Sequence, residues 1–188
     1  HILKMMEGQI VTEDVREEVG YTEEKGRKVF KPDGTYQKIA AVERHKNTGK
    51  IGVGIVKGFG LRGGAIASSV SHDSHNLIVI GDNDHDMYLA VQELLRTQGG
   101  YTLVENGQVF DTLPLPIMGL MSDAGYEKVN EKLARMISKA HEMGIPEGFD
   151  PFITLSFMAL PVIPEIRITP RGVYLTQEDR MIQSPFDR

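Results

Sequence analysis

The sequence predicts a mixed α/β (α+β) fold, built mostly of β hairpins with one strand–helix–strand unit and a second helix packed on the sheet. Three observations lead to this prediction. Apolar and polar residues alternate over 36–44, and a second strand follows at 51–56 across a polar turn, as in a hairpin. Apolar residues recur at helical spacing over 82–98 and 124–143. Short apolar runs, expected as strands, lie on both sides of the first helix.

The first 35 residues form an N-terminal segment, and residues 36–188 form the main domain. Within the segment, Gln9–Thr12 is expected as a short strand and the charged residues 13–34 as a loop. The pair Asp33–Gly34, which favours a turn, lies near the end of this loop.

Beyond the first hairpin, Ala65–Val70 and Leu77–Gly81 are expected as buried strands. Asx side chains at 82–84 predict the start of the first helix, and Gly99–Gly100 its end. A hairpin is expected over 101–111, turned at Asn106–Gly107.

The C-terminal third contains the second helix, an apolar run and a final hairpin. Ser122 and Asp123 are suited to cap the helix over 124–143. Periodicity does not assign the apolar run 152–163 to helix or strand, and the alternation over 166–175 predicts a hairpin.

Composition narrows the class of protein. A chain of 188 residues with 40% hydrophobic and 25% charged residues is expected to fold as one globular domain. The net charge of −5 argues against a nucleic-acid partner. No apolar run reaches the about 18 residues of a membrane helix, so no membrane partner is expected. The absence of cysteine suits a cytoplasmic protein.

The most informative stretch is the hexapeptide Ser71-His72-Asp73-Ser74-His75-Asn76, which lies between two predicted buried strands. A rigid sheet commonly displays functional groups on such connections. In an extended segment, Asp73 and His75 would face one way and His72 and Ser74 the other. An Asp-x-His pair can chelate a metal or orient a histidine for proton transfer. The alternative is a structural turn in which Asp73, Ser74 and Asn76 satisfy backbone groups. Since a metal site takes about three or four protein ligands, the hexapeptide could form one only with outside help.

Three further features have a functional and a structural interpretation. The glycine loop Gly58–Gly63 matches the dinucleotide fingerprint, but a strand rather than the required helix is expected after it, so tight turns explain its glycines better. His45 follows a strand and could be an ordinary surface histidine. Glu165 follows a rigid Pro-Val-Ile-Pro run, where its alternative role is a salt bridge with Arg167 or Arg171.

Several segments together resemble the C-terminal domain of bacterial and archaeal adenine deaminases. The resemblance covers nearly the whole chain, and its most specific parts are the His-Asp-Ser-His-Asn and Leu-Pro-Leu-Pro segments. The segments that carry it are Gln9–Thr12, Glu43-Arg44-His45, Gly58-Phe59-Gly60, Gly64–Asn76, Leu113–Ser122, Pro151–Phe157 and Leu160–Glu165.

The resemblance implies a parent enzyme that hydrolyses adenine to hypoxanthine and ammonia, using manganese or iron in an N-terminal amidohydrolase barrel. This chain has no His-x-His metal motif and is shorter than a barrel of about 250 residues, so no metal ligand is assigned to it. The expected partners are that barrel, adenine and further copies of the chain. Supporting catalytic roles are expected for His72, Asp73 and His75. Substrate or interface roles are expected for His45, Ser71, Ser74, Asn76 and Glu165.

Three hypotheses remain open from the sequence. The chain is the C-terminal part of an adenine deaminase, inactive in isolation because the metal-binding barrel is absent. Alternatively, it is a free-standing purine-binding, regulatory or assembly module without deaminase activity. Thirdly, it is an independent enzyme that uses Asp73 and His75 with a bound metal.

Overall fold

A computed structural model describes residues 1–182. The helices are α1 (Asp84–Arg96), α2 (Tyr126–Glu142) and α3 (Pro151–Phe157). The strands are β1 (Ile2–Met5), β2 (Thr12–Val15), β3 (Tyr21–Glu24), β4 (Arg27–Phe30), β5 (Tyr36–Val42), β6 (Ile51–Lys57), β7 (Gly64–Ser68), β8 (Leu77–Gly81), β9 (Gly100–Glu105), β10 (Gln108–Pro114), β11 (Ile166–Thr169), β12 (Gly172–Leu175) and β13 (Arg180–Ile182). No helix in this part of the chain is long and apolar enough to cross a membrane.

The main sheet has eight strands in the order β10-β9-β7-β8-β5-β6-β1-β2. Its neighbours pair antiparallel, except that β1 runs parallel to β6. The predicted hairpins β5–β6 and β9–β10 are confirmed. So is the strand–helix–strand unit, because β8 and β9 run parallel on either side of β7, with α1 connecting them. The sheets of residues 1–182 are open, and none closes into a barrel.

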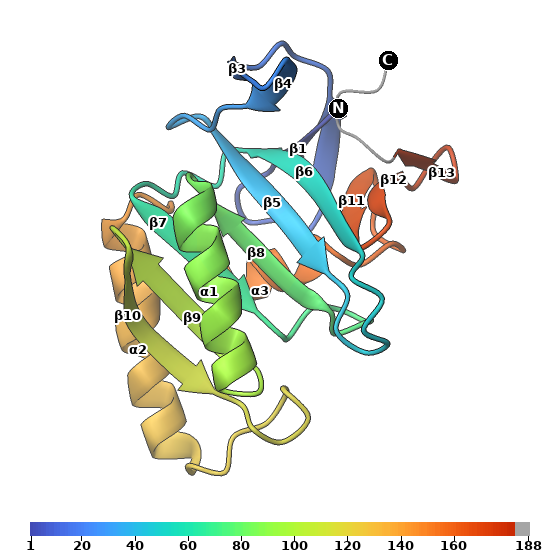
Figure 1. The fold of residues 1–188 in the computed structure, drawn as a ribbon. Coiled ribbons are helices and arrows are strands. Elements are labelled where there is room, and N and C mark those ends of the chain that lie inside the picture. The colour runs from blue at the N-terminus through green and yellow to red at the C-terminus, as the bar shows by residue number, and fades with distance from the viewer. Residues whose placement is uncertain (183–188) are drawn as a thin grey trace.

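The main sheet is covered on both faces, which confirms the mixed α/β class. Helix α1 lies over one face, where its apolar stripe packs on small and branched side chains of β7 and β8 (Figure 1). The other face is covered by α2, α3 and the small sheet β11-β12-β13. The stripe of α1 is formed by Met87, Ala90 and Leu94.

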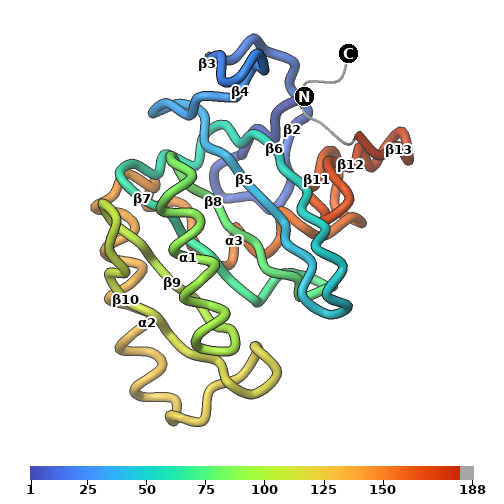
Figure 2. Tube along the Cα trace, viewed as in Figure 1, coloured from blue at the N-terminus to red at the C-terminus, as the bar shows by residue number. Residues whose placement is uncertain are grey.

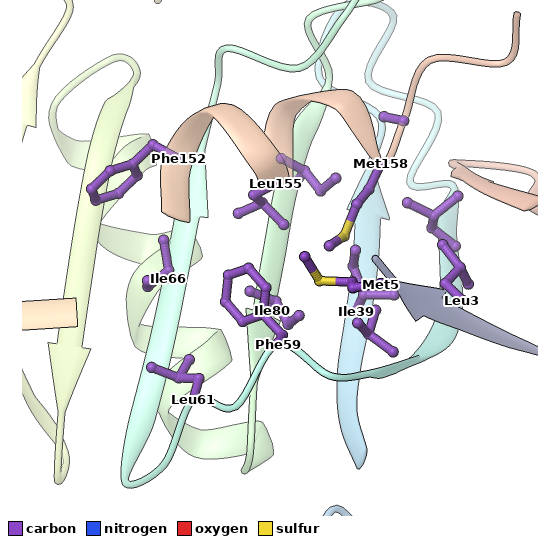
Figure 3. Close-up of a cluster of buried hydrophobic side chains, with 14 of the residues drawn as sticks. Leu3, Met5, Ile39, Phe59, Leu61, Ile66, Ile80, Phe152, Leu155 and Met158 are labelled. Carbon is purple, nitrogen blue, oxygen red and sulfur yellow. The ribbon is translucent and has the colours of Figure 1, made fainter. Parts of the chain in front are cut away.

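The core of the second face explains the apolar run that periodicity left unassigned. It begins as helix α3, capped by the Asp150 carboxylate, which accepts the amides of Phe152 and Ile153 at 3.0 and 2.9 Å. Phe152 and Leu155 then point from α3 toward the sheet and the glycine loop (Figure 3). The residues they pack among include Phe59, Ile66 and Ile80. Burial against the sheet therefore decides the helical assignment here.

The N-terminal segment is more ordered than expected. The strand predicted at Gln9–Thr12 begins only at Thr12, where β2 pairs with β1. The charged residues expected as a loop instead include the rest of β2 and the β3–β4 hairpin. The prediction was wrong because edge strands carry charged residues on exposed faces, which hides the apolar alternation. Strands β1 and β2 both belong to the main sheet, so the segment is continuous with it.

The glycine loop Gly58–Gly63 contributes buried side chains to the core, and a strand rather than a helix follows it. Phe59 and Leu61 are fully buried, and β7 follows directly. At Gly60, with φ +79°, an added Cβ would meet the carbonyl oxygen of Gly144 at 2.5 Å. The amides of Gly63 and Gly64 donate to the Asp82 carboxylate at 2.5 and 3.0 Å. The backbone donors that would face a phosphate are therefore already paired with a carboxylate.

We expect no binding of NAD or ATP by this loop at concentrations below about 1 mM. The physical reason is that a strand rather than a helix follows the loop, and the amides of Gly63 and Gly64 already donate to the Asp82 carboxylate. Isothermal calorimetry with each nucleotide measures this directly. A micromolar Kd that disappears in a folded Gly60→Ala variant would contradict the structural interpretation of the loop.

Candidate functional site

The hexapeptide connects β7 to β8 at one end of the main sheet. The turn between β5 and β6 lies at the same end, because Val42 pairs with both Leu77 and Ile51 (Figure 2). The hexapeptide is anchored to the second face of the sheet through α3, where the His72 amide donates to the Ser156 carbonyl at 3.2 Å. A short connection fixed at both ends by buried strands can hold side chains in defined positions.

The hexapeptide is a tight turn, as its place between two strands indicates, so the facing pattern of an extended segment does not apply. The His75 amide donates to the Ser71 carbonyl at 2.6 Å, and His75 has φ +49°. A left-handed residue reverses the chain, so alternation no longer decides which side chains meet. The rings of His72 and His75 instead face each other edge to face, with centroids 5.8 Å apart.

Some side chains of the turn are buried and others reach the surface. Ser71 and Asn76 at its ends are buried. Asp73 projects outward with 84% of its side chain exposed, and 3.9 Å separates its carboxylate from His72 Nδ1. The His72 ring, 36% exposed, also packs on Phe157 with centroids 4.9 Å apart. The expected structural role is present for Asn76, whose Oδ1 accepts the backbone amide of Arg44 at 3.2 Å.

The tripeptide Glu43-Arg44-His45 holds this turn from the neighbouring strand. His45 Nε2 lies 2.6 Å from the Ser74 carbonyl oxygen, to which it donates. The Arg44 amide donates to Asn76 Oδ1 at 3.2 Å, and Arg44 Nε donates to the His75 carbonyl at 2.5 Å. The structure thus brings His45 together with the hexapeptide, as the sequence analysis grouped them.

Glu43 fixes the turn that carries His45. Its carboxylate accepts the amides of Thr48, Lys46 and His45 at 3.0, 2.7 and 2.6 Å, as well as the Thr48 hydroxyl at 2.9 Å. These bonds, led by the Thr48 amide, lower the pKa of Glu43 to about 2. Glu43 is therefore ionised throughout the neutral range and keeps its turn closed.

The environment of His75 favours the neutral imidazole. Burial lowers the pKa of His75 below its ordinary value of 6.5, electrostatic interactions with His72 and Arg44 lower it further, and Asp73 opposes them. At pH 7 the ring is thus uncharged, with one nitrogen able to accept a proton. Its buried Nδ1 and the buried Ser71 hydroxyl find no hydrogen-bond partner within residues 1–182.

The donor set around the hexapeptide does not fit a metal ion. Among the described residues, no three His, Asp or Glu side chains converge to hold one. The rings of His72 and His75 pack edge to face against each other, and the Asp73 side chain points to solvent. We therefore assign no metal ligand to these residues.

Glu165 lies with the N-terminal segment and away from the hexapeptide. Its carboxylate accepts the Asp14 amide at 3.0 Å, and its own amide donates to the Thr12 carbonyl at 2.9 Å. The strand register puts Thr12, paired with Met5, at the end of the sheet opposite the hexapeptide. No salt bridge joins Glu165 to Arg167 or Arg171 within residues 1–182, so its partners are backbone groups.

The chain matches the family described as the adenine deaminase C-terminal domain over residues 9–180. It belongs to this family. An adenine deaminase of Desulfitobacterium hafniense is 53% identical over 182 residues, which cover 97% of this chain and 31% of that protein. The adenine deaminase of Halalkalibacterium halodurans is 46% identical over 93% of this chain and 29% of its own length. That of Bacillus subtilis is 49% identical over 77% of this chain and 26% of its own length. The chain thus spans less than a third of these relatives.

Within this adenine deaminase domain, the sequence analysis missed Arg44 as an organiser of the site. Arg44 lies in the segment Glu43-Arg44-His45, which contributes to the family resemblance, but the sequence indicates only His45 as a candidate site residue. Its partners are main-chain carbonyls of His75 and Met118, and sequence patterns do not reveal contacts with backbone oxygens. Ser156 and Phe157, which touch His72, were missed for a related reason, because the helix that presents them was not assigned.

Proposed function

We propose that this chain is the C-terminal part of a metal-dependent adenine deaminase, which hydrolyses adenine to hypoxanthine and ammonia. Manganese or iron would be held by an N-terminal amidohydrolase barrel outside this chain. The family match and the share of the relatives that the chain covers support this proposal.

The observation that carries a functional role for the hexapeptide is its combination of a clamped backbone with displayed polar side chains. Its main chain is held by Arg44, His45 and Ser156, while the His72 and Asp73 side chains reach the surface. We assign supporting catalytic roles to His72, Asp73 and His75. Deamination moves protons from water to the departing ammonia, and a neutral imidazole is suited to accept or relay them.

The remaining polar residues of the turn would shape the surface that meets the rest of the enzyme or its purine. His45, Ser74 and Asn76 fix the turn by hydrogen bonds. The Ser71 hydroxyl and His75 Nδ1 have no partner within the described residues. Leaving such groups unpaired costs about 1–3 kcal/mol each. Hydrogen-bond partners from the rest of the enzyme, its purine or an interfacial water would remove this cost and so stabilise the complex.

The two alternative functions have less support. A free-standing purine-binding or regulatory module is not favoured, because the chain is 53% identical to part of an adenine deaminase over 97% of its length. An independent metalloenzyme would need Asp73 and His75 to converge on an ion with further ligands, and the turn does not arrange them so.

We expect the purified 188-residue chain to release no ammonia from adenine with added Mn²⁺ or Fe²⁺, whereas the full-length enzyme does. The reason is that the metal that activates water would, in the proposed function, be held by the N-terminal barrel. Ammonia release measured by a coupled assay, with the full-length enzyme as positive control, tests the expectation. Metal-dependent turnover by the isolated chain that Asp73→Ala abolishes would favour the independent enzyme instead.

A further inference from the structure

The Arg44 guanidinium joins the hexapeptide to a second loop. Its Nε donates to the His75 carbonyl at 2.5 Å, and its Nη2 donates to the Met118 carbonyl at 2.9 Å. One planar cation thus holds carbonyls from two loops that are distant in sequence. Guanidinium is suited to this task, because its donors are fixed in a plane and point in several directions.

Both carbonyls belong to residues in left-handed backbone conformations. His75 has φ +49° and Met118 has φ +60°; residues other than glycine uncommonly adopt this region, and histidine is enriched there whereas methionine is not. Such conformations persist when surrounding contacts hold them, and they cluster at functional sites. The next residue, Gly119, leaves room for the cation, because a Cβ there would meet Arg44 Nη1 at 2.6 Å.

The second loop is rigid in itself and apolar on its surface. We call residues 117–121 the methionine loop. The amides of Ile117 and Met121 each donate to the other's carbonyl, at 3.1 and 3.2 Å, and the Ser69 hydroxyl donates to the Gly119 carbonyl at 2.6 Å. Even so, its side chains face outward, with Ile117 44%, Met118 74% and Met121 53% exposed. A fixed loop that exposes three large apolar side chains beside a polar turn is typical of an interaction surface.

The longer relatives indicate what covers this surface. The chain corresponds to 31% of the Desulfitobacterium hafniense enzyme, so more than twice its own length belongs to the remainder. The methionine loop is continuous through Arg44 with the hexapeptide, for which we propose a role at the catalytic part. The occupant is therefore the catalytic part of the same enzyme.

We infer that Arg44 is a positioning residue, which fixes the hexapeptide and the methionine loop as one preformed surface for docking the catalytic part of the deaminase. This inference rests on the proposed function. Met118 would contribute an apolar contact to that part, while Arg44 acts through the two loops without touching the purine.

Three variants of the full-length enzyme test the inference. We expect Arg44→Gln to lower kcat at least about tenfold and to speed amide hydrogen exchange in residues 71–76 and 117–121. Arg44→Lys keeps the positive charge but loses the planar set of guanidinium donors. Its kcat and exchange rates are expected to lie between those of Arg44→Gln and the unmodified enzyme. Met118→Asn retains a residue tolerant of positive φ, so kcat should fall while exchange in the two loops stays unchanged. The control is Arg96→Gln, which removes an exposed arginine of α1. It should change neither kcat nor hydrogen exchange in the two loops.

Each outcome is informative. Normal kcat in both Arg44 variants, together with strongly reduced kcat in His72→Ala and Asp73→Ala, would overturn the inference and leave the proposed role of the hexapeptide intact. Normal kcat in His72→Ala and Asp73→Ala as well would overturn that proposed role. If Met118→Asn left kcat unchanged but dissociated an oligomer in size-exclusion chromatography, a second copy would be the occupant and our assignment would be wrong. If Arg44→Gln did not fold, Arg44→Lys would decide between these outcomes.

Discussion

In the full-length enzyme, His72→Ala and Asp73→Ala are each expected to lower adenine turnover by about 100-fold. The same substitutions should lower Tm by no more than about 5 °C, because Asp73 is largely exposed and His72 packs mainly on Phe157. A large loss of turnover with a small loss of stability distinguishes a functional group from a structural turn. Steady-state kinetics and differential scanning calorimetry of the same preparations measure both quantities.

The matched control is His85→Ala, which removes an exposed histidine in the first turn of α1 at the other end of the sheet. It should leave turnover and Tm nearly unchanged. The functional assignment of the hexapeptide fails if His72→Ala and Asp73→Ala both keep near-normal turnover. It fails equally if turnover falls only in proportion to the fraction of enzyme that unfolds.

For the isolated chain, Arg167→Met is expected to lower the free energy of unfolding by about 2–4 kcal/mol. The Arg167 side chain is fully buried. It donates to the Thr12 hydroxyl and to the carbonyls of Ile166, Ile10 and Pro164 at 2.9, 3.0 and 2.8 Å. Methionine fills a similar volume but removes these donors, although the carbonyls of Ile166 and Pro164 still accept from the hydroxyl and amide of Thr12. Urea unfolding followed by circular dichroism gives the difference.

The charge of Arg167 makes this site unusual. Burial lowers the pKa of Arg167 to about 10, which still leaves the guanidinium charged at neutral pH. Within residues 1–182 its partners are a hydroxyl and carbonyl oxygens, and no carboxylate forms an ion pair with it. The cation therefore ties the N-terminal segment to β11 through backbone oxygens.

The control for this prediction is Arg180→Met, which removes an exposed arginine paired with Glu178 at 2.8 Å. Exposed pairs contribute little, so the change should stay within about 0.5 kcal/mol. Equal effects of the two substitutions would show that the buried contacts of Arg167 do not hold the N-terminal segment in place.

Elements with local signals can be predicted from the sequence alone. Periodicity and turn residues predict helices α1 and α2, the hairpins β5–β6 and β9–β10, and the buried strands on either side of the hexapeptide. The capping of α2 by Ser122 and Asp123 was predicted wrongly, because the helix begins at Tyr126 after Gly125 and has no side-chain cap. The family could also be identified from short segments, because their combination of residue types is specific. The density of polar groups in the hexapeptide marked it as a candidate before any geometry was known.

Features that depend on long-range contacts could not be predicted from the sequence. Strand β2 begins at Thr12 because β1 and Glu165 supply its partners, and the run after Asp150 is helical because its apolar face packs on the sheet. Groups distant in sequence hold the turned hexapeptide in place, because Arg44 and His45 donate to its carbonyls. Glu165 lies apart from it because strand register, which no local pattern encodes, sets the end of the sheet at which each loop lies.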